Sequence, residues 1–288
     1  MKKFFLCIPV LILLLSACNQ KAEPVAKSSP DKKAAAESGD KEKSLTLEQV
    51  YEKTIEASNK LESLSLASEL NQSITLKDQP EPLAIKSDIQ MDVVKKPLSL
   101  YQKMKMTVEG QPPQETESYL TDDGFFQFDP VSKKWIKLPE NMTTELLKIQ
   151  NKQADPLAEL KKMQEFIKDI TFEMDDSHYI LTLHASGDKF QAFLQEELQN
   201  NLSPELAENL QLSDGMNIKS LSYVYYIDKE TYNPTKMINE MEIVTKQANE
   251  DIAINQKANS TFSNFNAIKS IEVPEQVLQS AQEMDITK

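Results

Sequence analysis

Residues 85–108 read IKSDIQMDVVKKPLSLYQKMKMTV. On either side of Lys96-Pro97 the apolar and polar residues alternate, as they do in a β-strand with one buried and one solvated face. The preceding residues, Leu64 to Leu76, carry the same period of two. Three consecutive strands of this kind predict an antiparallel meander with one apolar face and one wet face.

The rest of the chain contains further segments with the strand period of two and others with helical spacing of apolar residues. Tyr119 to Leu138 predicts a further hairpin that turns at residues 129–134. Capping residues ahead of helical apolar spacing predict helices that begin at Thr46, Asn141 or Thr143, Asp155, Asp188, Ser203 and Pro274. Further strands are predicted over residues 170–174, 179–185, 218–227, 236–245 and 252–265.

Runs of strands separated by groups of helices indicate an α+β fold rather than a parallel α/β fold. A wide antiparallel sheet twists and curls, so its apolar face becomes the inside of a trough. We therefore predict a strongly curved antiparallel half-barrel sheet with helices packed on its concave face. Residues 45–288 are expected to form this domain.

The first 17 residues have the pattern of a signal peptide. Lys2 and Lys3 precede an apolar run, Phe4 to Leu15, that is too short to span a membrane. The run ends in Leu15-Ser16-Ala17-Cys18, which resembles the lipobox of bacterial lipoproteins. This resemblance implies that Cys18 receives a diacylglycerol and begins the mature chain. A plain secretory signal with a chance cysteine is the alternative.

Residues 18–44 contain no aromatic and almost no large aliphatic residue. Such a segment cannot bury enough apolar surface to order itself, so it is predicted to be a disordered tether. The chain is then expected on the outer face of the cell membrane, held there by two acyl chains on Cys18.

Charge and reactive residues exclude several functions. The net charge is −13, or −15 once residues 1–17 are removed, so binding to nucleic acid is not expected. His178 and His184 are the only histidines, and six residues of strand separate them too widely to share a metal. No catalytic motif accompanies them. We therefore expect no enzyme activity, no cofactor and no metal.

Several features together resemble the lipoprotein-carrier fold of the LolA and LppX type, and a set of Gram-positive lipoproteins of unassigned role. They are an N-terminal helix leading into Leu64-Ser65-Leu66, an aromatic hairpin closing on Trp135, and the Asp228-Lys229 to Pro234 hairpin. The resemblance implies a half-barrel plugged by helices, with an apolar cavity between them that accepts acyl chains.

Flexible thioethers and aromatic rings suit a pocket for acyl chains. The candidate cavity-lining residues are Met91, Met104, Met106, Phe126, Phe128 and Tyr225. Plain core packing beneath the helices is the alternative for all six. The resulting hypothesis is a membrane-anchored, non-enzymatic domain that binds a lipid or other apolar ligand. A protein- or cell-wall-interaction module with a filled core is the second hypothesis, and the sequence identifies no protein partner.

Overall fold

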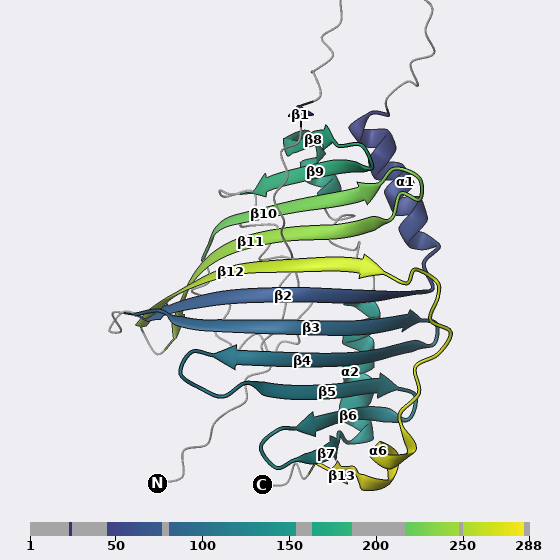
Figure 1. Cartoon of the computed structure of the whole chain (residues 1–288), viewed down its shortest axis with the longest axis vertical. Helices are drawn as coiled ribbons and strands as arrows, with labels where there is room; N and C mark the ends of the chain where they lie inside the picture. The colour runs from purple at the N-terminus through teal and green to yellow at the C-terminus, as the bar shows by residue number, and fades with distance from the viewer. Residues whose placement is uncertain are drawn as a thin grey trace, which may run out of the picture.

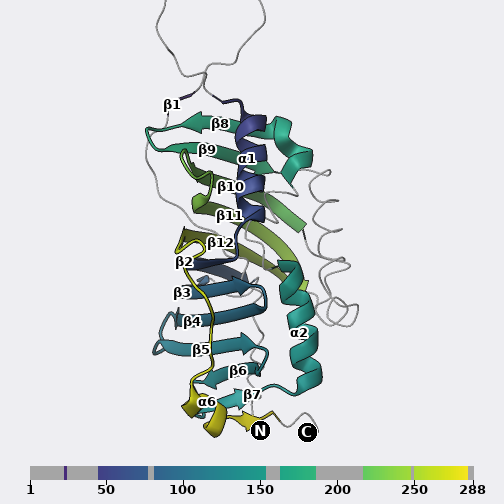
Figure 2. The same cartoon turned by 90° about the vertical axis from the view of Figure 1, so that its right-hand side faces the viewer.

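One large sheet organises the chain (Figure 1). The computed structural model describes residues 23–24, 45–76, 81–153, 163–185, 217–247 and 250–284. Their 13 strands lie in the order β1-β8-β9-β10-β11-β12-β2-β3-β4-β5-β6-β7-β13. Within these residues the two edge strands, β1 and β13, do not pair with each other, so the curved sheet stays open (Figure 2).

The strands follow the predicted alternation closely. Their bounds are Glu23–Pro24 (β1), Ser63–Leu76 (β2), Leu83–Lys95 (β3), Leu98–Val108 (β4), Gln114–Thr121 (β5), Gly124–Asp129 (β6), Lys134–Lys137 (β7), Ile170–Met174 (β8), His178–Ala185 (β9), Asn217–Asp228 (β10), Pro234–Gln247 (β11), Glu250–Ser263 (β12) and Gln282–Glu283 (β13). The predicted three-strand antiparallel meander is confirmed for β2 to β4, and the predicted hairpin of residues 119–138 continues it through β5 to β7. Only β13 is parallel to its neighbour, β7, among the pairs in the described residues.

A long-range pairing joins the two halves of the sheet. Strand β12 returns to lie antiparallel to β2, and Ala258 lies across from Leu70. In the sequence, all the elements from β3 to β11 lie between these two neighbouring strands. This pairing extends one surface from β8 to β7.

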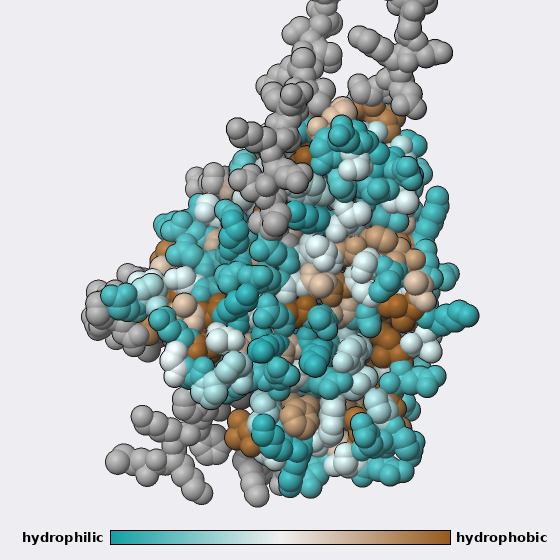
Figure 3. Space-filling model, viewed as in Figure 1, coloured by the Kyte–Doolittle hydropathy of each residue, from teal (hydrophilic) through white to brown (hydrophobic). Residues whose placement is uncertain are grey.

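The two faces of the sheet differ in chemistry. The apolar face carries Leu64, Leu70, Leu181, Leu221 and Tyr225, all nearly completely buried. The opposite, polar face carries cross-strand ion pairs such as Lys86–Glu69 at 3.2 Å and Lys105–Glu115 at 3.6 Å. Figure 3 shows this second face, which is predominantly hydrophilic. The expected division into an apolar and a wet face is confirmed.

Helix α1 (Leu47–Asn59) packs on the apolar face. Thr46 caps it, because its hydroxyl accepts from the Gln49 N–H at 3.3 Å while Gln49 Oε1 accepts from the Thr46 N–H at 3.0 Å. The helix buries Val50, Tyr51, Thr54 and Ser58. Each fully buried large apolar side chain contributes about 1.5–3 kcal/mol relative to exposure, so this stripe holds α1 to the sheet.

Two further helical segments lie against the same core. They are α2 (Glu140–Gln153), through Leu147, and a 3₁₀ helix, η1 (Met163–Asp169), through Phe166 and Ile167. Packing of helices on one face of an open curved sheet agrees with the predicted half-barrel. The α-helix expected from Asp155 differs: residues 154–162 lie outside the described residues, and the segment that follows is 3₁₀.

The C-terminal segment lies on the opposite, polar face of the sheet. Helix α6 (Glu275–Ser280) begins after Pro274 as predicted, but it packs on the polar face, so that α2 and α6 lie on opposite sides of the sheet (Figure 2). The polar face of β4 to β7 is therefore partly covered by the C-terminal segment rather than open to water.

The signal peptide, Cys18 and the helices predicted from Asp188 and Ser203 lie outside the described residues. Of the predicted tether, Glu23–Pro24 is described, and it pairs with β8.

Candidate functional site

The apolar face is the candidate site because it gathers most of the core. Its buried cluster draws on α1, η1, β2 to β4 and β9 to β12. The largest buried side chains include Tyr225, Leu64, Leu70, Leu181 and Ile227, each with less than 2% or about 2% of its surface exposed. Burial raises the pKa of Tyr51 to about 12, so the phenol of α1 adds no charge to this region.

Four of the six predicted lining residues lie on this face. Tyr225 is buried in the core, and Met91 packs against that core from β3. Met104 lies across from Ile89, and Met106 lies across from Ser87, so both occupy the continuation of the face on β4. All three methionines are half-buried, so the apolar face is incompletely covered at Met91 and along part of β4, although Ile89 and Val93 of β3 are buried.

Phe126 and Phe128, the other two predicted lining residues, do not lie on the apolar face. Phe126 lies across from Tyr119, and Phe128 lies across from Trp135. Phe126 and Tyr119 belong to a second cluster on the polar face, where Phe126 is 1% exposed beneath Val273 and Val277 of the C-terminal segment. Phe128 contacts Trp135, which packs against this cluster. The two phenylalanines therefore lie on the sheet face opposite to Met91, Met104, Met106 and Tyr225. The hairpin residue on the apolar face is Phe125, across from Leu120.

Aromatic contacts hold the second cluster together. Tyr119 lies with its ring centroid 4.9 Å from that of Tyr101 and 5.8 Å from that of Trp135. Phe128 meets Trp135 edge to face at 5.6 Å. Burial, together with a hydrogen bond to Glu117, raises the pKa of Tyr119 well above its usual value. The cluster is a packed junction between β4 to β7 and the C-terminal segment.

Neutral polar side chains occupy the middle of the apolar face, in three adjacent cross-strand positions. Ser260 Oγ lies 3.1 Å from Ser68 Oγ, and Gln72 Nε2 donates to Gln256 Oε1 at 3.1 Å. Asn239 of β11 lies between these two pairs and is 0% exposed. Asn239 and its buried neighbours Met237 and Met241 were not singled out from the sequence. The available signal was a polar residue at an apolar position between two methionines.

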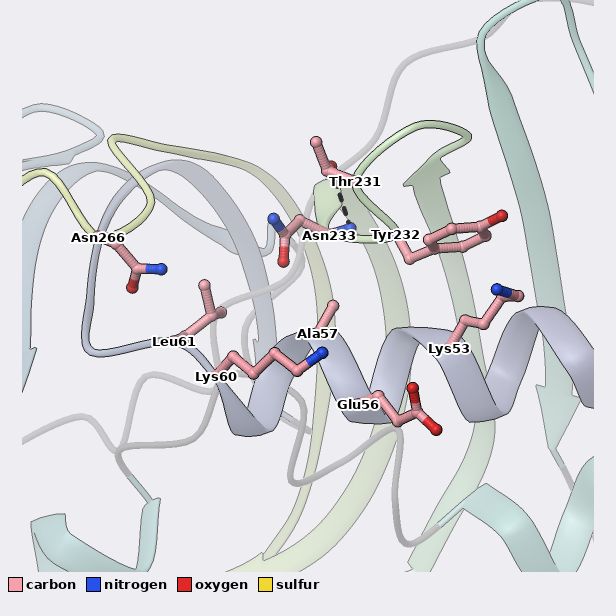
Figure 4. Close-up of a pocket in the computed structure, with 9 residues that line it drawn as sticks. All are labelled: Lys53, Glu56, Ala57, Lys60, Leu61, Thr231, Tyr232, Asn233 and Asn266. Atoms are coloured by element: carbon pink, nitrogen blue, oxygen red, sulfur yellow. Dashed lines mark hydrogen bonds between the residues drawn. The ribbon is translucent and has the colours of Figure 1, made fainter.

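The described residues also line two hollows at the surface. One holds about 360 Å³ between α1 and the β10–β11 turn, and Lys53 Nζ lies 4.7 Å from the centroid of the Tyr232 ring at its edge (Figure 4). The other, about 740 Å³, is a transverse groove across β2 and β9 to β12.

The groove runs between two cross-strand rows on the polar face. The first row consists of Asn71, Lys257, Glu240, Ser222 and His184, and the second of Ser73, Asn255, Glu242 and Ser220. Lys257 forms an ion pair with Glu240 inside it. The lining also includes Ala185, Leu221 and Met241, so the groove combines these polar rows with apolar surface.

Catalytic geometry does not emerge around the histidines. Both Ser177 Oγ and Asp175 Oδ1 approach the same ring atom of His178, Nδ1, at 3.3 and 3.2 Å. A relay needs the hydroxyl and the carboxylate on opposite ring nitrogens, so this trio is a turn contact. His184 lies across from Ser222 on the polar face. In the described ranges, no three His, Cys, Asp or Glu side chains gather closely enough to hold a metal ion.

No helix within the described residues is long and apolar enough to cross a membrane.

Comparison with known proteins gives a family and distant structural likenesses. The profile of a family of unknown function, DUF6612, matches residues 46–282. No curated protein matches the chain. Among solved structures, lipoprotein LppX of Mycobacterium tuberculosis is similar, with 13% identity, a TM-score of 0.38, and coverage of 78% of this chain and 98% of that one.

Two other solved structures are similar at lower scores. A DUF1329 family protein from Desulfovibrio piger is 10% identical, with a TM-score of 0.24 and coverage of 78% and 95% of the two chains. A β-barrel-like protein of domain DUF1849 from Brucella abortus is 9% identical, with a TM-score of 0.21 and coverage of 69% and 97%.

Proposed function

The chain belongs to the DUF6612 family of unknown function, and from its own residues we propose that it binds a lipid or other apolar ligand between the curved sheet and its helices. The observation that carries this proposal is the incompletely covered part of the apolar face. Met91, Met104 and Met106 remain half-buried there, and Met91 packs against the buried core. Adaptable thioethers beside a dry core suit a flexible acyl chain.

The N-terminal sequence supports a location for this binding. Leu15-Ser16-Ala17-Cys18 has the lipobox pattern, and a diacylglycerol on Cys18 would tether the domain to the outer face of the cell membrane. A tethered domain would take up or present its ligand near the membrane surface. In this proposal the protein performs no catalysis.

Native mass spectrometry of the full chain, purified from its own membrane in mild detergent, tests the proposal. We expect a mass above that of the lipidated protein, and recovery of the excess in an organic extract. Protein that carries no excess mass, and that takes up no lipid when mixed with an extract of the same membrane, would contradict ligand binding.

The transverse groove favours a second function, as a protein- or cell-wall-interaction module. Its two hydrophilic rows offer amide, hydroxyl and carboxylate groups to an extended polar partner. Sedimentation of the full chain with purified cell wall tests this alternative. Asn255→Ala and Glu242→Ala should each weaken it, whereas an exposed change away from the groove, Lys103→Ala, should not.

A further inference from the structure

Asn239 stands out among the buried residues of the apolar face. Its side chain is 0% exposed and lies between Met237 and Met241 along β11, with Tyr223 and Ala258 as its cross-strand neighbours. Neither Oδ1 nor Nδ2 has a hydrogen-bond partner among the residues that the structure describes. A buried amide left without partners destabilises the folded state, so its presence calls for a physical reason.

Polar side chains in the neighbouring rows of this face are paired with each other. On one side, Ser260 Oγ and Ser68 Oγ pair with each other at 3.1 Å. On the other side, Gln72 and Gln256 pair at 3.1 Å. These four side chains form two hydrogen-bonded pairs, whereas the Asn239 amide has no hydrogen-bond partner among the described residues.

We propose that Asn239 hydrogen-bonds the polar group of an amphiphilic ligand whose apolar chain crosses the same face from Met237 toward the half-buried Met104. A carboxamide offers one acceptor and a donor pair, which match a neutral group containing both a carbonyl and a hydroxyl. This inference rests on the proposed function and names its ligand class, a neutral lipid such as a monoacylglycerol.

Charge argues for a neutral group rather than an anionic one. Every buried polar side chain in the described part of the chain is uncharged, and the whole protein has a net charge of −13. A carboxylate or phosphate brought to Asn239 would be desolvated without a cation to pair with it.

Replacing the amide by an apolar side chain of similar size separates a ligand contact from a structural role. In Asn239→Leu, and in the smaller Asn239→Val should leucine fit poorly, we expect a higher Tm because an unpaired buried amide is removed. Ser68→Ala is the matched control, since its hydroxyl is already paired with Ser260. It should lower the Tm and leave ligand preference unchanged.

The readout is equilibrium binding of 1-oleoylglycerol, oleate and 1-octadecene to the full chain in detergent. Wild type should prefer 1-oleoylglycerol, and both Asn239 variants should bind it about tenfold more weakly, the loss of one to two net hydrogen bonds. Binding of 1-octadecene, which has no polar group, should stay unchanged.

Two results overturn the inference while leaving the proposed function intact. One is an unchanged preference for 1-oleoylglycerol in the variants, which would mean that Asn239 holds only a buried water. The other is a lower Tm with equal loss of all three probes, which would make Asn239 a structural residue. Wild-type protein that binds none of the probes and carries no lipid from its membrane would overturn the proposed function itself.

Discussion

Phe125 and Phe126 follow each other in β6, yet their side chains lie on opposite faces of the sheet, Phe125 across from Leu120 and Phe126 across from Tyr119. Successive side chains of a strand point to opposite faces, so a hairpin with three phenylalanines contributes to both sides. Phe125 faces the candidate site, whereas Phe126 is buried beneath the C-terminal segment.

This arrangement predicts that stability and ligand binding separate at these two positions. Phe126→Ala should cost about 3–5 kcal/mol of unfolding free energy, because it opens a cavity beneath Val277. Phe125→Ala should cost less, since Phe125 is only half-buried. Urea unfolding followed by circular dichroism measures both. Lipid retained per folded molecule should be unchanged in Phe126→Ala; a drop there at unchanged stability would place the ligand on the polar face.

The alternation predicted strands β2 to β4 and their shared apolar face, but it predicted neither the strand order of the whole sheet nor the face of every lining residue. Ile89 and Met104 share a face because the period of two fixes their side, and the pairing of β3 with β4 then brings them together. For Phe126, the alternation alone could not predict the sheet face on which the side chain lies. Its parity could not be related to that of Met104 across two turns without the register, and an aromatic side chain is buried equally well on either face.

The C-terminal segment and Asn239 illustrate two other limits. Val273 and Val277 cover the polar face through contacts far apart in sequence, which no local pattern encodes. Asn239 occupies an apolar position of β11, and the sequence does show that irregularity. Its burial without a partner depends on how β10 and β12 pack beside it, which only the assembled sheet reveals.

The capping box of α1 provides a stability test away from the sheet. Thr46→Ala removes the acceptor of the Gln49 N–H and should cost about 1 kcal/mol of unfolding free energy. Thr46→Ser retains the hydroxyl and should remain within a few tenths of a kcal/mol of wild type. Thermal unfolding of the three proteins side by side gives the comparison, and equal losses in both variants would show that the cap is not the cause.

Acid should destabilise the β10–β11 turn through Asp228. Although partial burial opposes it, hydrogen bonds from the Glu230 N–H and from the N–H and hydroxyl of Thr231 hold the pKa of Asp228 below its usual 3.8. A carboxyl with a lowered pKa stabilises the fold above the unfolded value, and the contribution disappears as the pH falls through the folded pKa.

Asp228→Asn should therefore lower the urea midpoint at pH 7, and the difference from wild type should shrink once the pH falls below about 3.8. Asp176→Asn, in the neighbouring turn, is the control, because that side chain is exposed. A gap between Asp228→Asn and wild type that stays constant from pH 7 to pH 3 would mean that the charge of Asp228 does not stabilise the turn.

Lipidation makes a prediction about location that is independent of the fold. Cys18→Ser removes the sulfur that would carry the diacylglycerol, so the variant should lose labelling by radioactive palmitate and leave the membrane fraction. The variant domain should keep the wild-type Tm, since Cys18 precedes it by more than two dozen residues of predicted tether. Cys18→Ser protein that still takes up palmitate would rule out this cysteine as the attachment site.

The final prediction compares two neighbouring residues of β4. Met104 lies half-buried on the apolar face, and Lys103 is exposed on the polar face. Met104→Glu places a carboxylate where the acyl chain is proposed to lie, and it should reduce lipid retention at least tenfold because a charge there must be desolvated. Since Met104 is already partly in contact with water, the free energy of unfolding should change by no more than about 1 kcal/mol. Lys103→Glu, which introduces the same carboxylate one residue away, should leave retention unchanged. Native mass spectrometry gives the retained lipid, and urea unfolding gives the stability. If Met104→Glu lowers both in proportion, Met104 is a packing residue, and the face on β3 and β4 is core rather than binding site.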